Sequence, residues 1–160
     1  MKFVVDTSAL LSLRCSQFYN EIRQTNTLLL PTEVIAELKQ FAVYDDFLGT
    51  KAQELLKQSF IVKKPKTYIS LKIEKTECVV FSLAKEEKCI ALIDDVHAAR
   101  IVYEELKMKT KPSFYALILL YKKKIITKEQ LIEDLQNILA HRHWLNSALW
   151  KYALHTIKDM

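Results

Sequence analysis

The chain passes repeatedly from a short apolar run to a stretch whose apolar residues recur at helical spacing. Four short runs have the length and the apolar or β-branched composition of strands: Lys2–Val5, Thr27–Leu30, Phe60–Val62 and Cys89–Ile93. The last run is continuously apolar, as expected of a strand that is covered on both faces. These runs predict the strands of one sheet.

Helices are predicted after most of these strands. Asp6, Thr7 and Ser8 offer short polar side chains that cap a helix beginning around Ala9. The pattern predicts further helices after Thr32 and over about residues 49–58, 76–85, 96–106 and 128–155. The last of these stretches gives the chain a helical C-terminus.

Strands that alternate with helices indicate a mainly parallel sheet between two helical layers, which is a three-layer α/β/α fold. In such folds the ligand crevice lies outside the carboxyl ends of the strands. The chain has 160 residues and is 50% hydrophobic, so it is near the usual size of one domain and can bury a core. We therefore expect a single α/β domain over residues 1–160.

Composition narrows the function classes. Gly49 is the single glycine of the chain, whereas loops that cradle phosphates need several, so P-loop and dinucleotide-binding folds are excluded. The three cysteines form no Cys-x-x-Cys pair, which argues against a disulfide framework and a four-ligand zinc site. The net charge of +5 is compatible with a polyanionic partner such as RNA.

The N-terminus and the hydropathy of the chain bear on its location. There is no run of about 18 apolar residues, and Asp6 stands where a signal peptide needs its apolar stretch. The expectation is a soluble, cytoplasmic protein with no membrane partner.

Acidic residues stand at the ends of two predicted strands. Asp6 closes the first strand, and Asp94 and Asp95 close the apolar strand that ends at Ile93. Because the carboxyl ends of parallel strands meet at one edge of a sheet, these side chains are expected to lie close together. Taken singly, Asp6 has the simpler interpretation of a helix cap. For a pair of acids after a wholly apolar strand the simple interpretation is weaker, although Asp95 has the alternative role of serving the helix that follows.

Two further acids are predicted to face the same edge. Glu37 lies four residues after Glu33 and thus on the same helical face, next to the core. Glu77 lies in the first turn of a helix that Thr76 is predicted to cap, where the helix dipole favours a carboxylate. Each of these acids, taken alone, is also typical of a helix start or a solvated surface.

Several carboxylates within a few ångströms repel one another, and a divalent cation removes that repulsion. Mg2+ and Mn2+ prefer oxygen ligands, so a set of carboxylates with no histidine or cysteine nearby suits them better than zinc. Such an ion activates a bound water and stabilises charge on a phosphodiester. Phosphodiester hydrolysis is therefore the predicted reaction.

Four segments resemble, in order, the motifs of a known family. Val4–Leu10 is similar to a motif in which an apolar strand precedes Asp-Thr/Ser-Ser, and Pro31–Leu38 to one that ends in a metal-binding Glu. Lys75–Cys78 resembles a Gly-Glu-x-Glu helix start, and Ile93–Arg100 an Asp-Asp-x-x-Ala-Arg segment. These are motifs of PIN domains, in particular of the small stand-alone archaeal and bacterial type that includes VapC-like toxins. The resemblance covers about residues 1–125 and leaves about 126–160 as a helical extension.

This resemblance implies a ribonuclease that depends on Mg2+ or Mn2+. The residues it implies for the metal site are Asp6, Glu37, Glu77 and Asp94 or Asp95, with Thr7 or Ser8 supporting the metal shell through a hydroxyl. Family members often pair with an antitoxin and dimerise, so it also implies a toxin–antitoxin pair, an antitoxin partner and a homodimer.

Basic residues near the expected crevice are candidates for RNA contacts. Arg100 lies on the helix after Asp95, and Lys111 follows in the next segment. A solvated basic surface is the alternative interpretation of the lysines. The histidines at 141 and 143 are not expected to form a metal site, because side chains two residues apart on a helix point to different faces.

The chain departs from the family pattern in two places. Lys75 stands about where the third motif has its glycine, and the segment Lys111–Ser113 stands where a Gly-Thr segment is expected. The second departure supports an alternative, namely a catalytically weak PIN-like module for RNA binding or assembly. A third hypothesis, an aspartate-phosphorylating α/β domain, fits poorly because a haloacid-dehalogenase-like start would carry Asp-x-Asp where this chain has Asp6-Thr7-Ser8.

Overall fold

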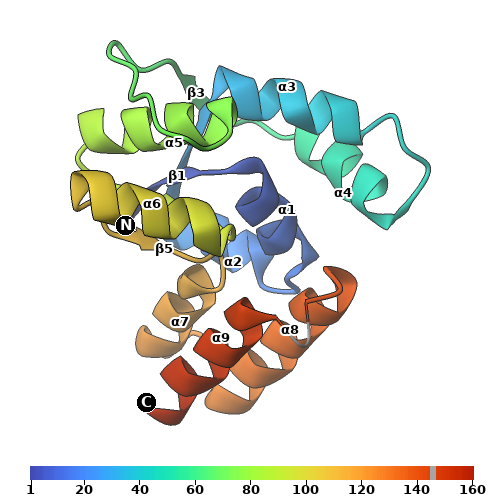
Figure 1. The fold of residues 1–160 in the computed structure, drawn as a ribbon. Helices are drawn as coiled ribbons and strands as arrows, with labels where there is room; N and C mark the ends of the chain where they lie inside the picture. Colours follow the sequence, from blue (N-terminus) through green and yellow to red (C-terminus); the bar gives the residue numbers. More distant parts are fainter. Residues whose placement is uncertain (145–146) are drawn as a thin grey trace.

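The computed structural model describes residues 1–144 and 147–160, and these contain a five-stranded, wholly parallel sheet (Figure 1). Its strands are β1 (Lys2–Val5), β2 (Thr27–Pro31), β3 (Ile61–Lys63), β4 (Ile90–Leu92) and β5 (Thr110–Lys111). They lie in the order β3-β2-β1-β4-β5, so the direction of strand addition reverses at β1. The predicted parallel sheet is confirmed.

Helices cover both faces of this sheet, which confirms the three-layer α/β/α fold. The helices are α1 (Thr7–Cys15), α2 (Tyr19–Thr25), α3 (Thr32–Phe41), α4 (Phe47–Leu56), α5 (Lys75–Glu86), α6 (Val96–Leu106), α7 (Tyr115–Lys122), α8 (Lys128–His141) and α9 (Ala148–Lys158). Helix α5 lies across β1, β2 and β4, with α6 beside it, while α1 and α2 pack on the opposite face (Figure 1). Right-handed crossovers account for this arrangement. The chain adds β2 and β3 on one side of β1 and β4 and β5 on the other, so the helices that connect them fall on opposite faces of the sheet.

The C-terminal helices α7, α8 and α9 gather beyond the sheet, beside α1 and α2 (Figure 1). A buried carboxylate attaches them: Asp134 of α8 accepts hydrogen bonds from the Ser16 hydroxyl (2.5 Å) and the Gln17 amide (2.9 Å), just after α1. Both oxygens of Asp134 are thereby satisfied, which offsets the cost of burying the group. Helix α8 is therefore held in a fixed position relative to β1 and α1.

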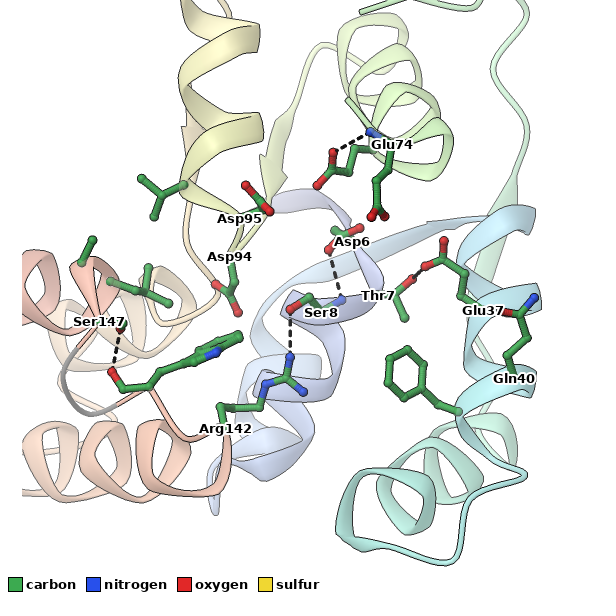
Figure 2. A pocket seen from close by; sticks show the side chains of 16 residues that line it. Asp6, Thr7, Ser8, Glu37, Gln40, Glu74, Asp94, Asp95, Arg142 and Ser147 are labelled. Atoms are coloured by element: carbon green, nitrogen blue, oxygen red, sulfur yellow. Dashed lines mark hydrogen bonds between the residues drawn. The ribbon is translucent and has the colours of Figure 1, made fainter. Parts of the chain in front are cut away.

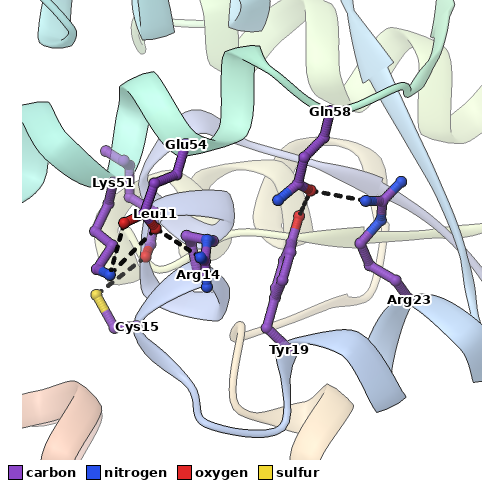
Figure 3. A network of polar contacts seen from close by, with 8 residues as sticks. All are labelled: Leu11, Arg14, Cys15, Tyr19, Arg23, Lys51, Glu54 and Gln58. Atoms are coloured by element: carbon purple, nitrogen blue, oxygen red, sulfur yellow. Dashed lines mark hydrogen bonds and ion pairs between the residues drawn. The ribbon is translucent and has the colours of Figure 1, made fainter.

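Helix α4 is connected to α1 and α2 by polar contacts (Figure 3). Arg14 of α1 forms an ion pair with Glu54 of α4 at 2.6 Å. Gln58, just after α4, accepts hydrogen bonds from the Tyr19 hydroxyl (2.9 Å) and the Arg23 guanidinium (2.7 Å). These contacts fix the helical pair α3–α4 at the side of the sheet.

The single glycine is required by a close approach of two backbone segments. Gly49, in the first turn of α4, is buried, and a Cβ at this position would lie 1.9 Å from the Tyr44 carbonyl oxygen. Any larger residue would force the turn between α3 and α4 to move.

Element boundaries differ from the expectations in places that have a local cause. Helix α1 begins at Thr7, earlier than expected, because the Asp6 side chain caps it by accepting from the Ser8 amide. Helix α5 begins at Lys75 with Glu74, instead of Thr76, at its N-cap position; the Glu74 amide donates to Glu77. The short elements α2, α7 and β5 were not predicted. Residues 145 and 146 of the stretch predicted to be helical lie outside the described residues.

The length and apolar character of the helices bear on whether one could cross a membrane. Within residues 1–144 and 147–160, none combines the length and the apolar character that crossing a membrane requires.

Candidate active site

A cleft of about 600 Å3 opens where β1 and β4 end, beside the point at which the strand order reverses (Figure 2). This is the position at which parallel α/β sheets bind their ligands. Among the described residues that line it, six carry carboxyl groups: Asp6, Glu37, Glu74, Glu77, Asp94 and Asp95. The acids predicted from strand ends and from the family motifs thus line one cleft, together with Glu74, which was not predicted.

Asp6 is positioned by the strand that it follows and the helix that it caps. Its backbone amide donates to the Leu92 carbonyl oxygen at 3.1 Å, which extends the pairing of β1 with β4. Its side chain accepts from the Ser8 amide at 3.0 Å, and only 6% of the residue is exposed. The second carboxylate oxygen is left for a ligand in the cleft.

Asp94 follows β4, the neighbour of β1 in the sheet. Its Oδ1 accepts from the Ser113 amide at 2.7 Å, whereas Oδ2 is buried and has no hydrogen-bond partner among the described residues. The segment Lys111–Ser113, which departs from the family pattern, therefore still orients Asp94. A buried carboxylate oxygen without a partner is costly and indicates a position for a bound cation or donor.

Glu37 reaches the cleft from α3, and Thr7 holds it there. The Thr7 hydroxyl donates to Oε2 of Glu37 at 2.5 Å (Figure 2). Thr7 was predicted to support the metal shell through its hydroxyl. In the structure that hydroxyl contacts Glu37, a candidate metal ligand. Asp95 is exposed and accepts from the Ala98 amide at 2.8 Å, so it caps α6 as well as lining the cleft.

Burial and mutual repulsion change the acidity of the cluster. Burial raises the pKa of Asp6 from 3.8 to about 7, and the carboxyl groups of Glu37, Glu77 and Asp94 add to the rise. Burial likewise raises the pKa of Glu77 from 4.5 to about 7. Burial raises the pKa of Asp94, while the amide and hydroxyl of Ser113, the Ser12 hydroxyl and Arg142 act in the opposite direction. Without a cation, part of this cluster therefore holds protons near neutral pH.

A family model described as a PIN domain matches residues 2–159. The chain belongs to the PIN-domain family. The match includes helices α8 and α9, beyond the segment that carries the recognised motifs. No curated protein matched the chain.

PIN domains are generally nucleases and typically bind divalent metals, and the cleft fits such an ion in its chemistry. Carboxylate oxygens dominate its potential ligands, and neither histidine nor cysteine is among the described residues lining it. Over residues 1–144 and 147–160, no group of three or more His, Cys, Asp or Glu forms a ready-made metal site. Mg2+ is commonly held by about one or two carboxylates, with waters and substrate phosphates as the other ligands, so Asp6 and Asp94 suffice to begin such a site.

The C-terminal helices of this PIN domain also contribute to the cleft. Arg142, at the end of α8, donates from Nη2 to the Ser8 hydroxyl at 2.9 Å (Figure 2). Trp144, Ser147 and Leu149 line the same side. The segment His141–His143 stands out in the sequence because of its two histidines. Arg142, between them, is the residue that lines the cleft.

The two candidates for RNA contact lie outside the lining of the cleft. Arg100 pairs with Glu104 on the exposed surface of α6 at 2.8 Å. Lys111 lies over the Tyr115 ring, 5.1 Å from its centroid, at a separate small cavity. His141 stacks on Phe47 with ring centroids 4.3 Å apart. Arg100 and Lys111 stay predictions for the path of a longer RNA.

Proposed function

We propose that this PIN domain is an endoribonuclease that hydrolyses RNA phosphodiester bonds with Mg2+ or Mn2+. The observation that carries the proposal is the pair of buried carboxylates at adjacent strand ends: Asp6 and Asp94 line one open cleft, and Oδ2 of Asp94 has no partner among the described residues. A bound divalent ion supplies an activated water and stabilises charge on a phosphodiester.

The residues of the chain have separate roles in this proposal. Asp6 and Asp94 bind the ion, and the amides of Ser8 and Ser113 orient them. Glu37, fixed by Thr7, and Glu77 complete the acidic rim and add carboxylate oxygens from α3 and α5. Because these side chains are held before substrate arrives, little reorganisation accompanies the reaction.

The direct test is cleavage of an end-labelled single-stranded RNA by the purified protein with Mn2+. Wild-type protein is expected to cleave with Mn2+ and not with EDTA, and Asp94→Asn is expected to be inactive. Asp45→Asn is the matched control, because Asp45 is exposed and does not line the cleft. Equal cleavage by wild type and Asp94→Asn would refute the proposal.

An alternative function is an RNA-binding or assembly module with weak catalysis. It is favoured by the lack of a ready-made group of three metal ligands in the described part of the chain. Calorimetry distinguishes the two functions: absence of Mn2+ binding, together with salt-sensitive RNA binding, would support the module and exclude the nuclease.

We further propose that the protein is the toxin of a toxin–antitoxin pair, acting in the cytoplasm as a homodimer with an antitoxin protein as partner. The support is the resemblance of four motifs to stand-alone VapC-like proteins. Induced expression in a bacterial host is expected to arrest growth, and Asp94→Asn is expected not to. Growth arrest by both proteins would contradict a toxin role that depends on this cleft.

A further inference from the structure

The guanidinium of Arg142 is held inside an otherwise acidic cleft. It donates to the Ser8 hydroxyl from one side, and the Trp144 ring lies 4.4 Å from its central carbon on the other. Helix α8, which carries it, is attached to the end of α1 through buried Asp134. Arg142 is therefore a positioned residue and not a surface side chain that happens to reach the cleft.

Most of the donors of this guanidinium are unused. Nε and Nη1 are buried and have no hydrogen-bond partner among the described residues. No ion pair within 4.0 Å joins Arg142 to a carboxylate in residues 1–144 and 147–160. Burial lowers the pKa of Arg142, and the nearby Asp94, Cys15 and Asp6 oppose that lowering. Leaving buried charged donors without partners is unfavourable, so this arrangement favours a ligand that supplies oxygens.

The charges of the cleft indicate which ligand that is. Six carboxyl groups and one guanidinium line it, counting the described residues, so an anionic substrate would be repelled everywhere except near Arg142 or a bound cation. The planar fork of arginine matches the paired oxygens of a phosphate. A phosphodiester would pair with Arg142 and with a cation held by the acids, whereas a neutral ligand would leave the guanidinium unpaired.

We propose that Arg142 binds the non-bridging oxygens of an RNA phosphate in this cleft. The inference rests on the proposed nuclease function and assigns the two sides of the cleft different tasks. The strand-end acids hold the cation, and the C-terminal helices supply the cationic contact to the phosphate. Trp144 stacks on the guanidinium and fixes its plane.

A role for Arg142 as a counter-charge to the acids predicts a different effect on RNA cleavage. If it only neutralises the acids in place of a metal ion, removing it would strengthen Mn2+ binding and leave RNA cleavage unchanged or faster. If it binds phosphate, removing it strengthens or preserves Mn2+ binding while cleavage falls. The two measurements together separate these roles.

The test compares Arg142→Gln, Arg142→Lys and Lys85→Gln for cleavage of a labelled single-stranded RNA and for Mn2+ affinity by calorimetry. Lys85→Gln removes an equal charge at an exposed residue in the last turn of α5, which does not line the cleft. We expect Arg142→Gln to lower kcat/KM by about 100-fold or more with Mn2+ affinity equal or higher. Arg142→Lys, which keeps the charge but not the fork, is expected to lose about tenfold.

Cleavage by Arg142→Gln at the wild-type rate would overturn the inference, as would loss of Mn2+ binding in both Arg142 variants, since that indicates a structural role. RNA affinity in the presence of Mn2+, measured by fluorescence anisotropy, separates failure of the inference from failure of the proposed function. If wild type does not cleave RNA but Arg142→Gln binds it at least about tenfold more weakly than Lys85→Gln does, the phosphate contact stands and catalysis does not. If wild type cleaves and Arg142→Gln binds and cleaves equally well, the inference alone fails.

Discussion

Replacing Asp6 by asparagine is expected to stabilise the metal-free protein at alkaline pH while abolishing its metal-dependent activity. Asp6 is 6% exposed and its carboxylate lies among other acids. Asparagine is neutral, has nearly the same shape, and keeps an oxygen that accepts from the Ser8 amide. It caps helices about as well as aspartate does. The substitution therefore removes the buried charge and little else.

The size of the effect follows from the raised pKa of Asp6. The value rises from 3.8 to about 7 on folding, so the folded state binds the proton more tightly than the unfolded state. Stability is then lost as the pH rises from about 4 to about 7, and the loss is complete above that range. At about 1.4 kcal/mol for each pH unit, the ionised side chain costs roughly 4 kcal/mol at about pH 8, which is an upper limit because the structure relaxes.

The assay is thermal unfolding, followed by circular dichroism, of wild type and Asp6→Asn in EDTA at about pH 8 and about pH 5. Since each kcal/mol moves Tm by about 2–4 °C in a chain of this size, the variant is expected to melt at least about 5 °C higher at the alkaline pH. At about pH 5 the difference should fall by more than half. Exposed Asp45 again provides the control, and Asp45→Asn is expected to change Tm at neither pH.

Addition of Mn2+ at more than about 1,000 times Kd should reverse the order, because only the wild type gains the free energy of binding an ion, which is about 4.1 kcal/mol at 1,000 times Kd. If Asp6→Asn melts below wild type in EDTA at about pH 8, or if the difference does not depend on pH, then Asp6 is not a buried, repelled carboxylate. The explanation of the cleft as a set of acids that await a cation would then be wrong.

Three further substitutions test the site and its supports. Asp94→Asn is expected to lower the single-turnover rate of Mn2+-dependent RNA cleavage at least about 100-fold with Tm unchanged or higher; a lower Tm in EDTA would contradict this. Asp134→Ala leaves two donors of the α1–α2 turn unpaired and is expected to cost about 2 kcal/mol or more in urea denaturation; an unchanged midpoint would show that Asp134 does not anchor α8. Gly49→Ala places a methyl group 1.9 Å from the Tyr44 carbonyl oxygen and is expected to cost about 1–3 kcal/mol; equal stability would mean that this turn moves freely.

The parallel sheet and the edge at which the acids gather were predictable because they depend on local patterns. Short apolar runs ending in Asp6 and Asp94 identify neighbouring strand ends once the sheet is parallel. The elements that were missed carry weak local signals. Strand β5 has 2 residues and α2 has 7, while α7 is nearly all apolar and buried, so it has no helical periodicity to detect.

Residues brought by tertiary packing were not predictable. Arg142 contacts Ser8 across 134 positions in the sequence, and only the docking of α8 through Asp134 brings the two together. Glu74 was missed because glutamate is not a preferred N-cap residue, whereas Thr76 is. Its place at the cleft depends on the segment before α5, which has no periodic pattern.

The central claim is that the strand-end acids bind a divalent cation, and anomalous diffraction from a crystal soaked in Mn2+ tests it most directly. The expected result is an anomalous peak in the cleft within about 2.5 Å of carboxylate oxygens of Asp6 and Asp94. Manganese bound only at other surfaces, or absent from the crystal while both carboxylates keep their present hydrogen bonds, would contradict the claim.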